Sequence, residues 1–138
     1  MSEPAAPVLS IVVPMYNEEA CVGELHRRLT AALEPTGEAY EIVAVSDGST
    51  DGTNGMLAAL ATSDPCVRPR YLTRNTGQWA AMSAGFRAAQ GDWVVVMDAD
   101  LQNRPEDIPV LLAEARKGYD LVSGRRTGRP ESALLRLW

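Results

Sequence analysis

The sequence has few of the residues on which metal-binding and disulfide-stabilised domains depend. It contains two cysteines and a single histidine among 138 residues. Cys21 and Cys66 lie far apart and belong to no C-x-x-C pair, and together with His26 they do not make the ligand set of a structural zinc site. Two isolated cysteines of this kind are typical of small, inert thiols in a reducing compartment.

Long apolar runs and an excess of positive charge are also missing. No apolar stretch approaches the roughly 20 residues that a membrane-spanning helix needs, and the N-terminus has neither the basic nor the apolar region of a secretory signal. We therefore expect a cytoplasmic chain that does not itself cross a membrane. The net charge of -5 argues against general nucleic-acid binding, so no nucleic acid is expected as a partner.

The most informative stretch that is present runs from Trp93 to Asp100. Its apolar residues, which follow Gly91 and Asp92, predict a fully buried strand. Asp98 and Asp100 come where that strand ends, and ligands bind at the carboxyl ends of strands in open α/β sheets. A hard divalent cation carrying phosphate oxygens would compensate two such carboxylates. The pattern indicates a metal–diphosphate site, with a solvated acidic turn as the alternative.

Strand-like and helix-like segments alternate along the whole chain. Apolar and β-branched runs predict strands at residues 9–13, 40–45, 70–73, 93–97 and 119–122, the first of them ended by Pro14. Apolar residues at helical spacing predict helices at residues 18–33, 51–60, 77–90 and 105–117. This alternation predicts an α/β fold with a mostly parallel sheet and helices on both faces. Residues 1–8 are expected to be a disordered lead, and residues 9–124 to form one domain.

Polar and glycine-containing motifs lie next to four of the predicted strands. A nucleotide-diphosphate pocket requires carboxylate and amide groups that bind the base and the ribose. It also requires glycines that allow close backbone approach and acids that hold a metal. The motifs are Pro14-Met15-Tyr16-Asn17-Glu18, Ser46-Asp47-Gly48-Ser49-Thr50-Asp51, Arg74-Asn75-Thr76-Gly77 and Asp98-Ala99-Asp100-Leu101-Gln102.

In this order the motifs resemble those of family 2 glycosyltransferases with the GT-A fold, and among them the polyprenyl-phosphate (dolichol-phosphate-like) sugar transferases. The resemblance runs from about Ser10 to the end of the chain, and its most specific part is Met97 to Gln102 followed by Pro105-Glu106. It corresponds to the N-terminal half of such enzymes, which implies a GT-A domain truncated at its C-terminus.

The implied activity is inverting transfer of a sugar from a UDP- or GDP-linked donor to an acceptor, with a polyprenyl phosphate favoured and Mg²⁺ or Mn²⁺ assisting. A nucleotide-sugar-binding fragment without turnover is the alternative. Haloacid-dehalogenase-like phosphatases also place Asp-x-Asp after a strand, but the position of the motif before Leu101 and the missing downstream acidic pair argue against that class. The dinucleotide-binding and P-loop glycine motifs are both absent.

The resemblance also implies residue roles. Asp47 would accept a hydrogen bond from the base, and Arg74 would lie near the nucleotide. Metal ligands would be Asp100 and Asp98. Catalytic candidates are Asp100, Gln102 and Arg126, with Arg126 and Arg129 either near the acceptor phosphate or solvated. The nucleotide-sugar-binding residues would be Pro14, Tyr16, Glu18, Asp47, Asn75, Gly77, Asp98 and Asp100.

The chain departs from the family pattern at two places and ends in a basic segment. Ser46 stands where many relatives have an acid, and Asn103-Arg104 replaces an Asp-Pro pair. Residues 125–138 combine arginines with leucines and a tryptophan, which predicts the start of an amphipathic helix at the inner face of the cytoplasmic membrane. Packing against a further domain is the alternative for this segment, and a homo-oligomer of a longer protein stays open.

Overall fold

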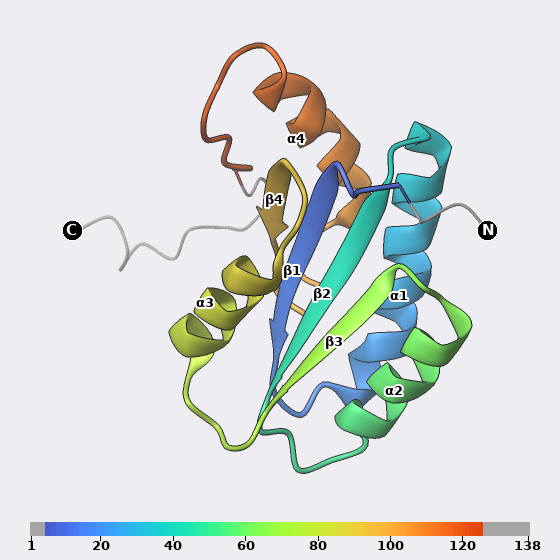
Figure 1. Cartoon of the computed structure of the whole chain (residues 1–138), viewed down its shortest axis with the longest axis vertical. Helices are drawn as coiled ribbons and strands as arrows, with labels where there is room; N and C mark the ends of the chain where they lie inside the picture. The colour runs from blue at the N-terminus through green and yellow to red at the C-terminus, as the bar shows by residue number, and fades with distance from the viewer. Residues whose placement is uncertain (1–4, 126–138) are drawn as a thin grey trace, which may run out of the picture.

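The computed structural model describes residues 5–125, and its centre is a four-stranded sheet (Figure 1). The strands are β1 (Leu9–Met15), β2 (Tyr40–Asp47), β3 (Val67–Leu72) and β4 (Trp93–Val96). They lie in the order β3-β2-β1-β4, and each neighbouring pair is parallel. The α/β fold with a parallel sheet, predicted from the alternating pattern, is confirmed.

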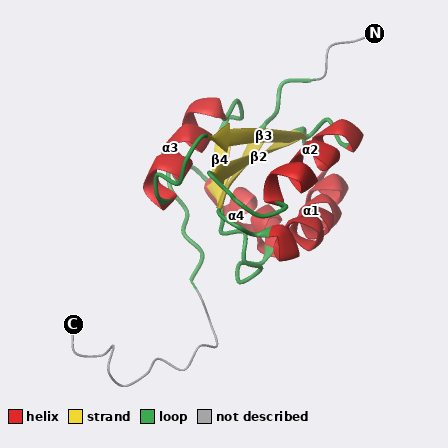
Figure 2. Cartoon of the chain, turned by 90° about the horizontal axis from the view of Figure 1, so that it is seen from below, coloured by secondary structure: helices red, strands yellow, loops and turns green. Residues whose placement is uncertain are grey.

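Helices cover both faces of the sheet, as Figure 2 shows. On one face lie α1 (Glu19–Leu33), α2 (Thr53–Ser63) and α4 (Ile108–Ala115), and on the other lies α3 (Gln78–Ala88). Two short 3₁₀ helices, η1 (Glu34–Thr36) and η2 (Pro105–Asp107), follow α1 and precede α4. Because every strand is parallel, all four carboxyl ends point the same way and the loops that follow them meet at one edge.

The larger core lies between the sheet and α1. Apolar residues at helical spacing on α1 (Val22, Leu25, Leu29 and Leu33) are buried against alternate side chains of the strands. Burying a side chain of this size contributes about 1.5–3 kcal/mol. The pattern that predicted the helix is therefore the one that attaches it to the sheet.

The smaller core depends on how closely α3 approaches the sheet. Ala81 and Gly85 are buried against Val12, Val43 and Val45. A Cβ atom at Gly85 would overlap Cγ1 of Val12. The small residues of α3 thus set the distance of this helix from the sheet, and with it the position of its N-terminus.

A buried carboxylate joins the amino end of the sheet to the segment after α3. Glu41 accepts hydrogen bonds from the hydroxyl of Ser10 (2.6 Å) and the backbone N–H of Gln90 (2.7 Å), and it pairs with Arg68. Burial alone would raise the pKa of Glu41, but these hydrogen bonds outweigh it and lower the pKa. This contact holds the C-terminal end of α3 in place.

Two expectations about the strands are wrong. The strand predicted at residues 93–97 is not fully buried, since Val94 and Val96 are 41% and 37% exposed. Residues 119–122 form no strand, and Leu121 is 86% exposed. Within residues 5–125, β4 pairs only with β1, so it is an edge strand, and residues 119–122 do not pair with its free edge.

Pro14 does not end the first strand, because β1 continues to Met15. The ladder between β1 and β4 covers only Leu9 to Val12, so the missing N–H of Pro14 lies outside that ladder. Other boundaries move by a few residues, as in α2, which begins at Thr53 instead of residue 51.

No helix of the described part is long and apolar enough to cross a membrane. Residues 1–4 and 126–138 lie outside the described residues, and with them nearly all of the predicted basic segment at residues 125–138.

Candidate functional site

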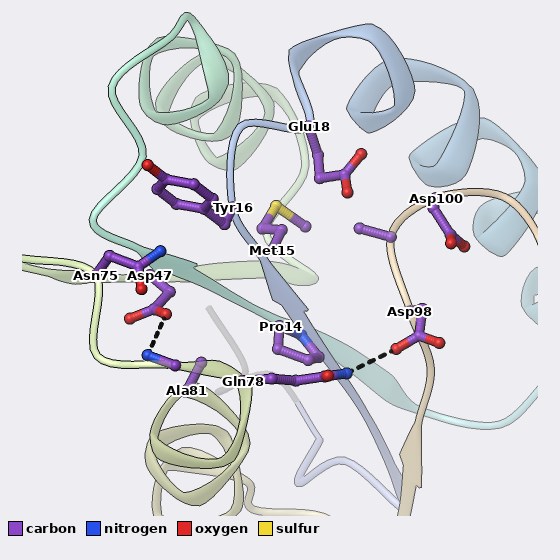
Figure 3. A pocket seen from close by; sticks show the side chains of 12 residues that line it. Pro14, Met15, Tyr16, Glu18, Asp47, Asn75, Gln78, Ala81, Asp98 and Asp100 are labelled. Carbon is purple, nitrogen blue, oxygen red and sulfur yellow. Dashed lines mark hydrogen bonds between the residues drawn. The ribbon is translucent and has the colours of Figure 1, made fainter.

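A pocket of about 420 Å³ opens where the loops after β1, β2 and β4 meet the N-terminus of α3 (Figure 3). Its volume lies within the range of small-molecule sites. All eight residues predicted to bind a nucleotide sugar line it. The complete lining is Pro14, Met15, Tyr16, Glu18, Asp47, Asn75, Gly77, Gln78, Ala81, Asp98, Ala99 and Asp100.

Asp47, at the end of β2, holds the loop that precedes α3. One carboxylate oxygen accepts hydrogen bonds from the backbone N–H and the hydroxyl of Thr76, and the other accepts from the N–H of Gly77, at 2.7–2.8 Å. Burial would raise the pKa of Asp47, but these three bonds outweigh it and lower the pKa. Since an ionised carboxylate offers about four acceptor positions, this arrangement is compatible with one further bond to a base.

Gly48 brings the same two loops into contact. It has a positive φ of 69°, and a Cβ atom at this position would overlap the backbone of Arg74 and Asn75. Only glycine combines that backbone conformation with such a close approach. The Asp-Gly sequence therefore brings Asn75 to the pocket wall.

The loop after β1 is fastened to the loop after β2 by Asn17. The side-chain oxygen of Asn17 accepts a hydrogen bond from the backbone N–H of Thr50 (2.8 Å). The backbone N–H of Asn17 donates to the hydroxyl of Ser49 (3.1 Å). Next to it, the N–H of Glu18 donates to the hydroxyl of Thr53 (2.9 Å). These bonds place Tyr16 and Glu18 at the pocket.

The acidic side of the pocket is formed by Asp98 and Asp100. Asp98 accepts hydrogen bonds from the side-chain amides of Gln78 (3.0 Å) and Asn103 (3.4 Å). Asp100 accepts one from the backbone N–H of Gln102 (3.1 Å). Figure 3 shows both carboxylates on the opposite side of the pocket from Asp47. The pocket thus has two distinct ends.

The backbone that leaves Asp100 is held in an uncommon conformation. Leu101 has a positive φ of 64°, which is rare for a bulky residue, and it packs against the larger core. Further on, Arg28 of α1 donates two hydrogen bonds to Glu106 of η2 (2.9 and 2.8 Å), and this contact lowers the pKa of Glu106 to about 2. The core and α1 together fix the course of the loop.

Comparison with known proteins identifies the family of this chain. Residues 10–136 match the family described as glycosyl transferase family 2. The chain belongs to this family. The family and fold implied by the strand-end motifs are therefore confirmed.

Curated members of glycosyl transferase family 2 extend well beyond this chain. The undecaprenyl-phosphate 4-deoxy-4-formamido-L-arabinose transferase of Pseudomonas paraeruginosa is 50% identical over 127 residues, which cover 91% of this chain and 38% of that protein. The protein of the same name from Shewanella sediminis is 47% identical over 129 residues, covering 93% and 39%. The chain thus spans about two fifths of the length of these relatives.

Solved structures of glycosyltransferases share the fold. The crystal structure of S. aureus TarS 1-349 in complex with UDP has a TM-score of 0.68 at 25% identity, and the match covers 88% of this chain and 38% of that one. The mannosyltransferase PcManGT from Pyrobaculum calidifontis, in complex with GDP-Man and Mn²⁺, has a TM-score of 0.63 at 30% identity, covering 83% and 33%.

The acidic end of this family 2 pocket has suitable chemistry for a divalent cation. Among the described residues, no group of three or more acidic, histidine or cysteine side chains is arranged to hold a metal by itself. Mg²⁺ is, however, commonly bound by one or two carboxylates together with substrate phosphates. Asp98 and Asp100 fit that pattern.

Not every predicted residue lines the pocket. Gln102 is exposed beside Asp100, and Arg74 is exposed with its backbone against Gly48. Arg126 and Arg129 lie outside the described residues. The polar lining residue that sequence reasoning missed is Gln78, which bonds to Asp98. Its position directly after Gly77, in the first turn of a helix that starts at the ligand-binding edge, was the available signal.

Proposed function

We propose that this chain forms the donor-binding half of a glycosyltransferase that moves a sugar from a nucleoside-diphosphate donor to a polyprenyl phosphate. The observation that carries the proposal is the meeting of all eight predicted donor-binding residues in one pocket at the carboxyl edge of the sheet. The relatives named as undecaprenyl-phosphate transferases support the acceptor class. The structures with UDP and with GDP-Man support the donor class.

The two ends of the pocket bind different parts of the donor. The end with Asp47 and Asn75 receives the nucleoside, because a carboxylate there can accept the imide N–H of uracil or the N–H of guanine. The end with Asp98 and Asp100 receives the diphosphate. Bound there by these two carboxylates, Mg²⁺ or Mn²⁺ would neutralise the charge that develops on the leaving diphosphate.

A lipid phosphate acceptor matches the side chains in the pocket. A hydroxyl acceptor needs a general base to become a good nucleophile. A phosphate monoester, whose second pKa is about 6, is largely ionised at neutral pH without one. Among the described residues, the pocket lining has carboxylates but no histidine or lysine. A carboxylate could serve a hydroxyl acceptor as general base, whereas an acceptor that is already anionic needs none. Asp100 and Gln102 then serve to position the donor sugar.

The basic segment at residues 125–138 is assigned to the acceptor side. Its arginines would meet the anionic inner face of the cytoplasmic membrane, where a polyprenyl phosphate is presented, and Arg126 would contact the acceptor phosphate. The second candidate function is donor binding without turnover, since the described residues form a donor pocket and the proposed acceptor contact, Arg126, lies outside them.

Two measurements separate these functions. Calorimetric titration of the chain with UDP and GDP in the presence of Mn²⁺, with ADP as the control nucleotide, tests donor binding. We expect UDP or GDP to bind more tightly than ADP. Assays of donor hydrolysis and of sugar transfer to a polyprenyl phosphate then test turnover. Equal and weak binding of all three nucleotides would refute the proposal, while binding without turnover would support the second function for this chain.

A further inference from the structure

Gln78 reaches across the candidate pocket from one end to the other. It is the first residue of α3 and follows directly on Gly77, which is bound by Asp47. Its side-chain Nε2 donates a hydrogen bond of 3.0 Å to Oδ1 of Asp98, on the loop after β4. Figure 3 shows the Gln78 side chain extended past Pro14 toward the acidic side. One residue therefore starts beside the Asp47 end of the pocket and contacts its acidic end.

This contact completes a path, made of two hydrogen bonds and the chain between them, that joins two strands that are not neighbours. The path runs from Asp47 at the end of β2, through the N–H of Gly77, to Gln78 and Asp98 beyond the end of β4. In the sheet, β1 separates β2 from β4. The path passes over the end of β1 at Pro14, which has no N–H to contribute. Gln78 thus links the two ends, through the chain to Gly77 at the nucleoside end and through a hydrogen bond to Asp98 at the acidic end.

We propose that Gln78 is a positioning residue that orients the Asp98 carboxylate for the diphosphate end of the donor, an inference that rests on the function proposed above. Asp98 lies on a loop, whereas Gln78 is fixed by a helix packed closely on the sheet. The second amide on Asp98, from Asn103, belongs to the same loop as Asp98 and is longer, at 3.4 Å. Gln78 therefore ties the Asp98 carboxylate to a helix that is packed on the sheet.

Orientation before binding raises affinity because it removes the cost of ordering a side chain when the ligand arrives. A hydrogen bond to a charged group also contributes more than a neutral one. Loss of the Gln78 contact is therefore expected to weaken binding of a nucleoside diphosphate with Mn²⁺ by about tenfold, which corresponds to ~1.4 kcal/mol. Binding of uridine or guanosine, which lack the diphosphate, is expected to stay unchanged because the bonds of Asp47 remain.

The test is calorimetric titration of the whole chain with UDP and with GDP in the presence of Mn²⁺. The variants are Gln78→Ala and the matched control Gln90→Ala, which removes the same side chain after the other end of α3. We expect weaker binding for Gln78→Ala only, at an unchanged melting temperature because Gln78 is exposed. In an Asp98→Ala background, Gln78→Ala should cause no further loss. Equal affinity of wild type and Gln78→Ala would overturn the positioning role.

A second measurement needs no nucleotide. The ¹H–¹⁵N signals of the Gln78 side-chain amide should shift when Asp98 is replaced by alanine, while those of Gln90 should not. Unshifted Gln78 signals would overturn the proposal. The two proposals also fail differently. If the wild-type chain binds neither UDP nor GDP, the proposed function fails and the positioning role with it. If a nucleotide binds and Gln78→Ala binds it equally well, only the positioning role fails.

Discussion

Thr76 donates two hydrogen bonds to a single oxygen of Asp47, from its backbone N–H at 2.8 Å and from its hydroxyl at 2.7 Å. Asp47 therefore has a structural task besides the base contact that the resemblance implies. It holds the start of α3 against the end of β2, and any experiment on base recognition has to separate the two tasks.

Replacing Asp47 by alanine should weaken binding of UDP or GDP by about 1–3 kcal/mol, since a bond to a charged acceptor is lost. Thr76→Val is the matched control, because it removes only the hydroxyl donor and leaves the carboxylate available to a base. Calorimetry should show a large loss for Asp47→Ala and a small one for Thr76→Val. Similar losses for both variants would leave Asp47 with the loop-holding task alone.

Asp47 also predicts how stability depends on pH. Its pKa is lower in the folded chain than in the unfolded one, so the folded state favours the ionised form. The resulting stabilisation is fully present above the unfolded-state pKa of about 3.9 and is lost as the pH falls through the lower folded-state pKa. Urea unfolding of wild type and Asp47→Asn between pH 2 and 6 should show a steeper acid loss for wild type. Parallel curves would contradict this.

The effect of a metal ion on nucleotide binding should depend on Asp100. Mn²⁺ is expected to strengthen binding of a nucleoside diphosphate to wild type and to have little effect on Asp100→Ala, because the carboxylate that would share the cation with the diphosphate is gone. Calorimetric titration with and without Mn²⁺ gives four affinities. If all four are equal, Asp100 is a solvated turn residue.

The contact between Arg28 and Glu106 should contribute modestly to stability. The pair is bidentate but the Glu106 side chain is 44% exposed, so we expect Glu106→Gln to lower the free energy of unfolding by roughly 0.5–1 kcal/mol. Because the pKa of Glu106 is lowered to about 2, this contribution is present above pH ~4.3 and disappears toward pH 2. Glu114→Gln, which breaks the exposed pair with Lys117, is the control and should have a smaller effect.

Gly48 and Gly55 should respond in opposite directions to alanine. Gly48→Ala places a Cβ in the left-handed region, which alone costs about 1–2 kcal/mol, and it also overlaps the Arg74 backbone. Gly55 lies in α2 with no atom near its missing Cβ, so Gly55→Ala should stabilise by about 0.5–1 kcal/mol. Thermal unfolding of both variants measures the contrast, and a stabilising Gly48→Ala would contradict the loop contact described above.

Membrane attachment is expected to depend on residues 125–138. Deletion of this segment should abolish co-sedimentation with anionic vesicles, and added salt should weaken it in the intact chain, since each arginine near such a surface contributes about 1 kcal/mol. Vesicles of zwitterionic lipid provide the control. Binding that is insensitive to the deletion or to salt would assign the segment to packing against another domain.

The sequence was sufficient to predict those parts of the fold that depend on local pattern. The stripe of Val22, Leu25 and Leu29 predicted α1, and the polar motifs predicted a pocket because parallel strands bring their carboxyl ends together. It could not show that, within residues 5–125, β4 is an edge strand and residues 119–122 form no strand. An apolar run has the same pattern in a central strand and in an edge strand. Gln78 was not predicted to line the pocket, because its role arises from a contact with Asp98, 20 residues away in the sequence.

The exposed position of β4 has a consequence for handling the protein. Within residues 5–125, the four apolar residues of this edge strand form a template on which other chains can aggregate. Aspartates flank them on both sides, at Asp92 and Asp98, and charged residues in such places act as gatekeepers against aggregation. We therefore expect Asp98 to oppose self-association in addition to lining the pocket. A neutral substitution at this position is expected to promote self-association, so light scattering should accompany every binding experiment on an Asp98 variant.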